Sequence, residues 1–497
     1  MPEIESKIYL RPGIPDDDNR EYLPESLKHS DIVVNENGNN SQPYPHRLIE
    51  RREVVIDDVE DRWYVYVPES YRPDSPTPLI ISLHGGMMTG WGQAVYSSWT
   101  AVADREGFIV VFPDAHARRF WTIDIAPARV EAITSPNPEG LFLHKPPASP
   151  EHNHDLRFLL ALIDLTASEY SIDRGRIFMQ GMSMGNAMAT QFARYFGDTL
   201  AGVAGSGGLT DPALLFSERG EVDNTAGPVP VWESRLDLDM GPTHFTGDIP
   251  SAVVMNREYW LRVNGASALP AISVRGPDNI AFYRGELADV VFRDVRNRDH
   301  GQTFDDAELV WDHFFSGMRR EPDGTVTRSE PLIPLRPDRF ALGVAAGRDY
   351  AWMSGERVPM STRAFAWDAV QYHGRGGSTL SRSRAVYAPL DLLAVAFDAR
   401  LIATGEGDVA TLVLSDGRSV QFARGAVACV VNNRVVAMDA EAVLRDGVLC
   451  ISVEWFALNL MNLRASQHSD VVYVTDHHSL LSGNMARLLS DLLVSDA

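Results

Sequence analysis

The sequence predicts an α/β protein in which a doubly wound, mostly parallel sheet is followed by a smaller α+β domain. Between residues 78 and 320, short apolar runs alternate with stretches of helical periodicity, which is typical of parallel strands joined by helical crossovers. A segment rich in Pro and charge, 321–335, then interrupts the pattern. After it come short strand patterns with frequent Gly turns. We therefore expect a polar arm over 1–47, a catalytic-sized domain over 48–322 and a second domain over 335–497.

The first domain begins with two period-two stretches, 51–71, which predict an antiparallel hairpin at a sheet edge. Buried strands are then expected within 78–86, 108–115, 176–181, 200–208, 228–234 and 289–297, and helices within 98–107, 155–170 and 305–320. In the second domain, VYAPLDLLAVAF (386–397) and VLCISVEWFALNL (448–460) are similar stretches, which predicts an internal repeat.

Composition limits the possible partners. A net charge of −22 without a cluster of Lys and Arg argues against nucleic acid. No apolar run approaches the ~20 residues of a membrane span. The first residues lack a basic start and an apolar core, which favours a cytoplasmic protein, with secretion or surface display after signal removal as the alternative. The only cysteines are Cys429 and Cys450, and the oligomeric state stays open.

The stretch GMSMG places Ser183 between Gly181 and Gly185, after an apolar run and before a helical pattern. This is the pattern of a nucleophile elbow, a strained strand-to-helix turn that exposes one hydroxyl. A serine nucleophile needs a general base, an acid that orients the base, and donors for the oxyanion. A tight turn that happens to contain serine is the alternative, so the other groups decide.

Suitable partners follow in the order serine, acid, histidine. His300 comes directly after the last predicted strand and is the candidate base. The loop RLDLDM offers Asp237 and Asp239 as the acid, and we favour Asp239 because it lies far enough past its strand to fold back towards the histidine. Asp237 remains open.

The turn HGGM follows the first buried parallel strand and is the second half of the expected oxyanion hole. Its backbone N–H at Gly86 or Met87 would act together with that of Met184. Three aromatic side chains near the predicted strand ends are candidates for substrate contact: His84, Trp91 and Trp121. For the two tryptophans, packing in the core is an equal alternative.

No cofactor or metal is expected. His152, His154 and Asp155 form the pattern EHNHD, for which metal ligation is one reading. We favour a polar helix start with Asp155 near the N-cap. No P-loop and no H-E-x-x-H motif occurs.

Several stretches of the sequence together resemble the polyhydroxybutyrate depolymerase and feruloyl esterase family of α/β-hydrolases. They include PLIISLHGG, AVADREGFIVVFPDA, RIFMQGMSMGNAMATQFA and DHGQTFDDAELVWDHFF, and the likeness covers about residues 50–320. The resemblance implies a serine esterase with Ser183, Asp239 and His300 as its triad. Its substrate would be a small or polymer-linked ester, hydroxycinnamoyl first and short hydroxyalkanoate or acetyl second. The alternative from another class is a surface or binding module whose hydrolase domain is vestigial.

The chain departs from that family at three places. Asn186 stands where a glycine usually follows the elbow, and Leu236 replaces the glycine common before the acid. The cysteines of secreted relatives are missing. The region 335–497 resembles, more faintly, the stalk domains that are similar to the copper amine oxidase N-terminal domain and are appended to bacterial surface enzymes. That likeness implies no copper.

Overall fold

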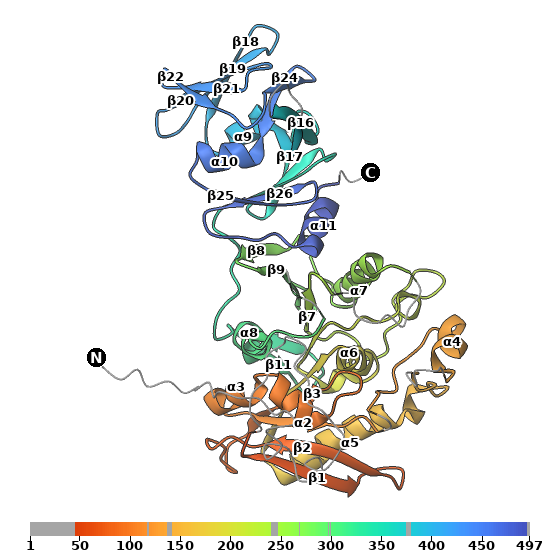
Figure 1. Ribbon diagram of the computed structural model, residues 1–497. Coiled ribbons are helices and arrows are strands. Elements are labelled where there is room, and N and C mark those ends of the chain that lie inside the picture. Colours follow the sequence, from red (N-terminus) through yellow and green to blue (C-terminus); the bar gives the residue numbers. More distant parts are fainter. Residues whose placement is uncertain are drawn as a thin grey trace. The chain divides into compact units, whose positions relative to one another are not determined.

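The structure is a computed structural model that describes residues 45–116, 119–136, 142–239, 247–267, 269–296, 298, 300–373 and 379–494, without the side chains of 369–382. Most of the expected N-terminal arm lies outside the described residues. The chain divides into two compact units. Unit 1 comprises 1–268, 282–293 and 298–335, and unit 2 comprises 269–281, 294–297 and 336–497 (Figure 1).

Unit 1 is built on a mixed sheet whose strands lie in the order β1-β2-β4-β3-β5-β6-β7-β10. These strands are β1 Leu48–Val54, β2 Glu60–Tyr66, β3 Thr77–Leu83, β4 Ile109–Pro113, β5 Ile172–Met182, β6 Gly202–Ser206, β7 Val231–Leu236 and β10 Val290–Val295, whose last two residues belong to unit 2. The run β4-β3-β5-β6-β7 is parallel, as the apolar runs predict, and β1 and β2 add an antiparallel edge.

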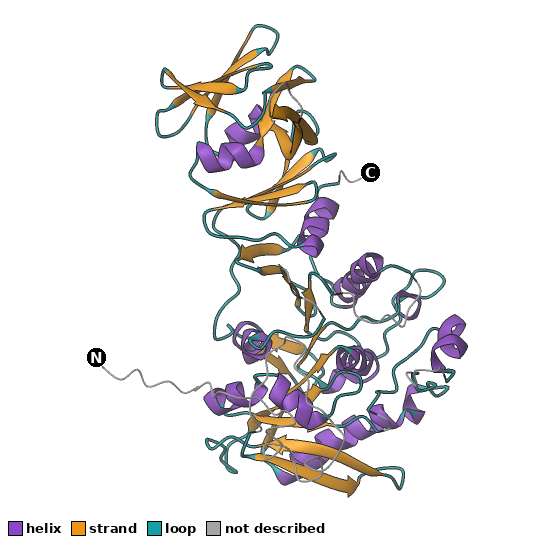
Figure 2. Ribbon diagram, in the orientation of Figure 1, coloured by secondary structure: helices purple, strands orange, loops and turns teal. Residues whose placement is uncertain are grey.

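The helices of unit 1 connect these strands (Figure 2). They are α2 Gly90–Tyr96, α3 Trp99–Glu106, α4 Val130–Thr134, α5 His154–Glu169, α6 Met184–Phe196, α7 Ile249–Val263 and α8 Asp306–His313. A small hairpin, β11 Met318–Arg320 with β12 Val326–Arg328, completes the unit. The strand β3 is buried along its whole length, which agrees with its mostly apolar sequence, TPLIISL.

Unit 2 is rich in strands. Its sheets are ordered β15-β14-β13-β26-β25, β16-β17-β24-β23 and β18-β19-β20-β21-β22. The bounds are β13 Ala341–Ala345, β14 Tyr350–Met353, β15 Glu356–Pro359, β16 Phe365–His373, β17 Thr379–Pro389, β18 Arg400–Thr404, β19 Val409–Val413, β20 Ser419–Ala423, β21 Ala428–Val431, β22 Arg434–Ala437, β23 Val443–Arg445, β24 Val448–Ser452, β25 Arg464–His468, β26 Val471–Thr475, and helices α9 Leu390–Ala396, α10 Val453–Asn459 and α11 Gly483–Leu492.

The two similar stretches of unit 2 adopt the same local structure. In each, a strand (β17 or β24) runs directly into a helix (α9 or α10), and the two strands pair antiparallel with Ala388 opposite Ile451. Both helices bury their apolar side chains in one core. A duplication remains a prediction from the sequence.

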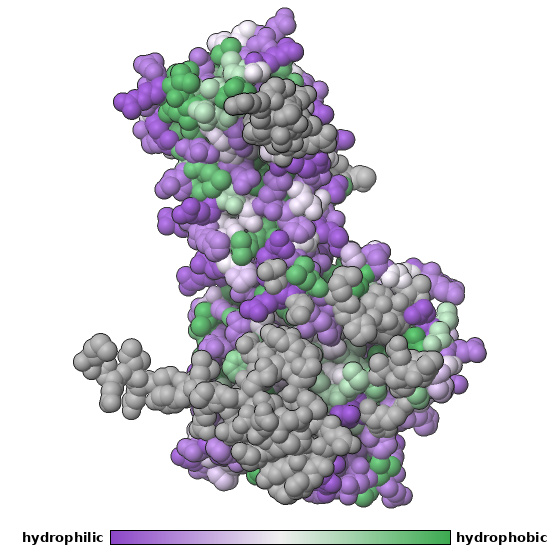
Figure 3. All heavy atoms as spheres, viewed as in Figure 1, coloured by the Kyte–Doolittle hydropathy of each residue, from purple (hydrophilic) through white to green (hydrophobic). Residues whose placement is uncertain are grey.

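Among the residues that Figure 3 colours, most of the upper part is hydrophilic, with an apolar patch at the sheet β18–β22. Its exposed apolar side chains are Ile402, Val427, Val430 and Val435. None of the helices in the described ranges is both long and apolar enough to cross a membrane.

The second unit starts earlier in the chain than the sequence pattern suggests. The segment 269–281, with β8 Ala271–Arg275 and most of β9 Asp278–Tyr283, belongs to unit 2. Asp338 holds it there: the Asp338 N–H donates to Ile272, and its buried carboxylate accepts bonds from Ser273, Val274 N and Tyr473 at 2.8–2.9 Å. Because these bonds join residues far apart in sequence, no local sequence pattern predicts them.

We expect Asp338→Ala to lower the stability of unit 2 by about 3 kcal/mol, because it leaves the Tyr473 hydroxyl and a buried N–H without their acceptor. Asp408→Ala, which removes an exposed ion pair with Arg424 in the same unit, is the matched control and should cost ~0–1 kcal/mol. Differential scanning calorimetry of both variants measures the change, and equal melting profiles would contradict this role for Asp338.

Candidate active site

Ser183 lies on the sharp turn between β5 and α6, at the carboxyl end of a central strand. Its backbone has φ 55° and ψ −119°, a conformation that residues other than glycine rarely adopt. The Ser183 N–H donates to the carbonyl of Ser206 on the neighbouring strand at 2.7 Å, which holds the turn in place. A strained serine at this position is what the GMSMG pattern predicts.

Both glycines of the pattern are required by close contact between backbones. A Cβ on Gly181 would lie 2.1 Å from the carbonyl oxygen of Gly185. A Cβ on Gly185 would lie 2.3 Å from the Leu83 carbonyl oxygen and 2.6 Å from that of His84. The start of α6 therefore packs directly on the end of β3, where the HGGM turn begins.

His300 and Asp239 extend from Ser183 in a continuous chain of contacts. His300 Nε2 is 2.7 Å from Ser183 Oγ, and His300 Nδ1 is 2.8 Å from Asp239 Oδ1. The imidazole is 30% exposed, whereas the Asp239 side chain is only 2% exposed. Of the two aspartates left open by the sequence, Asp239 is the one whose carboxylate contacts the histidine.

Backbone contacts fix the loops that carry these two side chains. Leu238 N–H donates to the carbonyl of Arg298, which ties the loop of the acid to that of the histidine. Asp239 N–H donates to Leu236, so the loop turns back within three residues of its strand. On the other side, Ser206 Oγ donates to the carbonyl of Gly301 at 2.6 Å.

The sequence left two backbone N–H groups, those of Gly86 and Met87, as the partner of Met184 in the oxyanion hole, and the structure favours Gly86. Met87 N–H already donates to the carbonyl of Arg119 at 2.9 Å, so it is engaged elsewhere. Gly86 remains beside Met184, since a Cβ on Gly86 would lie 3.5 Å from Met184 Sδ. Met184 is the first residue of α6, where backbone N–H groups have no partner within the helix. Gly86 and Met184 are therefore the better pair.

The prediction that three aromatic side chains contact the substrate is wrong, because they are buried. The relative exposures of His84, Trp91 and Trp121 are 0%, 2% and 0%. His84 Nε2 accepts from Ala115 N–H, and His84 Nδ1 is 2.6 Å from the Gly85 carbonyl. Burial lowers the pKa of His84 to about 4, so the ring is neutral. Trp121 packs on that ring and donates to the His84 carbonyl at 2.8 Å. These side chains shape the turn from within the core.

A buried polar pair behind the elbow was missed by the sequence analysis. Asn186 Nδ2 donates to Glu233 Oε2 at 3.0 Å and to the carbonyl of Gly208 at 2.9 Å. Burial raises the pKa of Glu233 to about 8, with the bond from Asn186 opposing that rise. The signal in the sequence was Asn186 itself, one of the departures from the family that the sequence resembles.

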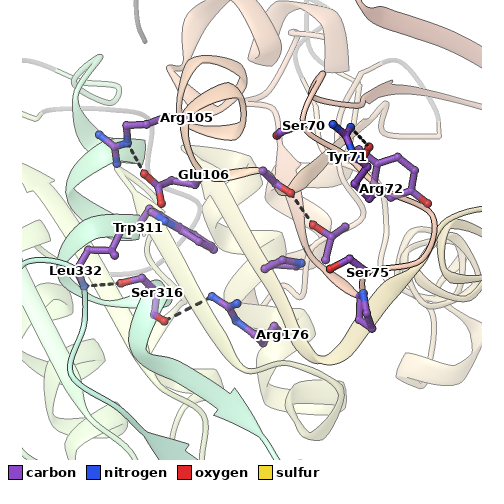
Figure 4. A pocket seen from close by; sticks show the side chains of 14 residues that line it. Ser70, Tyr71, Arg72, Ser75, Arg105, Glu106, Arg176, Trp311, Ser316 and Leu332 are labelled. Carbon is purple, nitrogen blue, oxygen red and sulfur yellow. Dashed lines mark hydrogen bonds and ion pairs between the residues drawn. The ribbon is translucent and has the colours of Figure 1, made fainter. Parts of the chain in front are cut away.

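A cavity of about 450 Å³ lies elsewhere in unit 1 (Figure 4). Thr77, Gly107 and Arg176 line it at the amino ends of β3, β4 and β5. Figure 4 shows Arg176 facing Ser316, whose carbonyl it approaches at 3.5 Å. Six residues of β5 separate Arg176 from Ser183, and the seven steps between them span roughly 23 Å along an extended strand. This cavity therefore does not belong to the Ser183 site.

The EHNHD pattern begins a helix, as expected, with Asp155 near its N-cap. The N-cap of α5 is Asn153, whose side chain accepts from Leu156 N–H, and Asp155 lies in the first turn. Asp155 is buried and accepts from the N–H groups of His116 and Thr122 in the loop after β4. His154 turns towards Asp57 and Asp61.

No family model matches this chain. In sequence, it is similar to a bifunctional acetylxylan esterase/xylanase of Neocallimastix patriciarum, 26% identical over 170 residues, covering 32% of this chain and 21% of the relative. It is also similar to feruloyl esterase B of Thermothelomyces thermophilus, 27% identical over 148 residues, covering 29% of this chain and 43% of the relative. The chain thus spans less than half the length of either relative.

Among solved structures, an acetyl xylan esterase from Aspergillus awamori matches with a TM-score of 0.38 at 16% identity, covering 53% of this chain and 98% of that one. A ferulic acid esterase from Anaeromyces mucronatus matches with a TM-score of 0.33 at 16% identity, covering 52% of this chain and 85% of that one. The resemblance of 335–497 to stalk domains remains a prediction.

The Glu233 carboxyl predicts a pH-dependent stability. Because its folded pKa of about 8 lies above its ordinary value, the folded state holds a proton that the unfolded state has lost, and stability falls as pH rises from about 5 to 8. Glu233→Gln keeps the shape without the ionisation, so it should match the wild type at low pH and exceed it near pH 8. Urea midpoints at both pH values measure the difference, and parallel curves would contradict a proton held at Glu233.

Proposed function

We propose that this chain is a carboxylic-ester hydrolase that works through an acyl-enzyme on Ser183. The observation that carries the proposal is the contact chain from Ser183 Oγ through the imidazole of His300 to the buried carboxylate of Asp239, at 2.7 and 2.8 Å. These three groups have the chemistry that acyl transfer needs: a nucleophile, a base and an orienting acid. The sequence similarity to two esterases supports the same reaction class.

In the proposed mechanism, Ser183 Oγ attacks the ester carbonyl while His300 Nε2 accepts its proton. Asp239 holds the ring through Nδ1 and stabilises the imidazolium that forms. The N–H groups of Gly86 and Met184 would donate to the oxyanion. His300 then returns the proton to the departing alkoxide. Water, activated by the same nitrogen, hydrolyses the acyl-enzyme and restores Ser183.

Hydroxycinnamoyl esters are the substrates we propose first, with acetyl or short hydroxyalkanoate esters as the alternative. One relative in sequence is a feruloyl esterase and the other an acetylxylan esterase, so each class has a precedent. Two exposed apolar side chains adjoin site residues: Met87 follows Gly86 and is 52% exposed, and Leu238 precedes Asp239 and is 51% exposed. They offer apolar surface for an acyl group.

Ser183→Ala should reduce hydrolysis by roughly 10⁴-fold or more, because the members of such a site act as a unit. The panel is methyl ferulate, p-nitrophenyl acetate, p-nitrophenyl butyrate and a 3-hydroxybutyrate oligomer. Ser168→Ala, an exposed serine on α5 away from the site, is the matched control and should keep full activity. A folded Ser183→Ala protein with undiminished turnover would exclude the proposal, and the rank order within the panel tests the substrate class separately.

The two aspartates of one loop form a second matched pair. Asp239→Asn removes the charge that stabilises the imidazolium and can trap the wrong tautomer, a change worth about 10⁴ in kcat in serine proteases. Asp237→Asn should stay within a few-fold of wild type, because its neighbour Asp239 makes the contact with His300. Steady-state kinetics on the best ester decide, and a slow Asp237→Asn beside a fast Asp239→Asn would reverse the assignment.

A further inference from the structure

Three side chains from distant parts of unit 1 converge at one place away from Ser183. Asp61 lies on β2, His116 in the loop after β4, and His154 at the start of α5. His154 Nε2 is 2.9 Å from Asp61 Oδ1, and His116 Nδ1 is 3.7 Å from the same oxygen. The two imidazole rings lie 4.2 Å apart. One ligand atom from each residue lies within 4.8 Å of the others, close enough to share one ion.

Asp61 supplies an independent observation. Its side chain is 1% exposed, and its second oxygen, Oδ2, is buried and accepts no hydrogen bond from the described residues. A buried carboxylate oxygen without a donor is costly, so such an atom calls for an explanation. A cation beside the two histidines that is bound by both oxygens of the Asp61 carboxylate would supply the missing partner of Oδ2.

The outer contacts of His154 match those of a metal ligand. Its other ring nitrogen, Nδ1, is 3.0 Å from Asp57 Oδ2. Asp57 is in turn held by Arg157, whose Nη1 lies 2.6 Å from Oδ1. Histidines that bind metals usually donate their second N–H to a carboxylate, which fixes the tautomer and leaves Nε2 as the ligand atom. Here that leaves His154 Nε2 facing Asp61.

The backbone around the cluster is also fixed. His116 N–H donates to Asp155 Oδ1 at 3.0 Å, so the residue next to His154 positions the loop of His116. Asp114 N–H donates to the carbonyl of Arg62, which fixes the same loop relative to the strand of Asp61. All three side chains are therefore held near one another before any ligand arrives.

We propose that Asp61, His116 and His154 bind a divalent transition-metal ion of the Zn²⁺ class. Two imidazoles and one carboxylate suit Zn²⁺ and its neighbours, whereas Ca²⁺ and Mg²⁺ prefer sets made of oxygen atoms. Three protein ligands leave a fourth position for water. The ion would join β2, the loop after β4 and the start of α5, and the proposal is independent of the esterase reaction.

The test is Zn²⁺ binding by the whole chain after removal of bound metal, measured by isothermal titration calorimetry. We expect wild type to bind a single ion, and Co²⁺ to give the visible absorption of a tetrahedral site. His116→Ala should weaken binding by at least 10-fold; because His116 is exposed, this change does not open the core. Asp57→Asn should weaken it by roughly 10–100-fold, as expected for an outer-shell carboxylate.

His152→Ala is the matched control, since His152 lies two residues from His154 but contacts Ser149 instead of the cluster. It should bind Zn²⁺ like wild type. Wild type that binds no ion, or His116→Ala that binds as tightly as His152→Ala, would overturn the site. The measurement can be repeated on Ser183→Ala, so its outcome does not depend on esterase activity.

Discussion

The contact between the backbone of Gly185 and the carbonyl groups of Leu83 and His84 is the constraint on which the rest of the site depends. Any side chain at residue 185 would meet these oxygens at 2.3–2.6 Å, so α6 could not begin where it does. In the same turn, Met184 lies beside Gly86 and Ser183 has a positive φ. The Ser183 hydroxyl faces His300. The strain of the turn, of order 1–3 kcal/mol for such a residue, is sustained by the packing around it.

The buried carboxyl groups behind this turn lie in different surroundings. Asp239 is shielded from water and faces both the His300 ring and, at 3.6 Å, the guanidinium of Arg235. Glu233 lies on the same strand as Arg235, and there burial favours the neutral carboxyl. Two carboxyl groups a few residues apart thus lie in different surroundings, and the imidazole of His300 is 30% exposed.

Sequence alone could predict the parallel strands and the positions of Ser183 and His300, because apolar runs and the GMSMG turn are local signals. It could favour Asp239 but not separate it from Asp237, since the choice depends on how the loop folds back from Leu236. It could not tell that Trp91 and Trp121 are buried, because aromatic residues near strand ends serve both core and pocket. Contacts between distant segments were also beyond reach: Asp338 with 272–274, and Asp61 with His154.

The central claim is that Ser183 is an activated nucleophile, and covalent labelling tests it most directly. A fluorophosphonate reacts only with a serine whose proton can be taken by a base, so the account predicts a single adduct on the peptide that contains Ser183. Mass spectrometry after proteolysis locates it, and His300→Ala should abolish it because the imidazole is 2.7 Å from the hydroxyl. An unlabelled folded protein, or an adduct on another serine, would contradict the account.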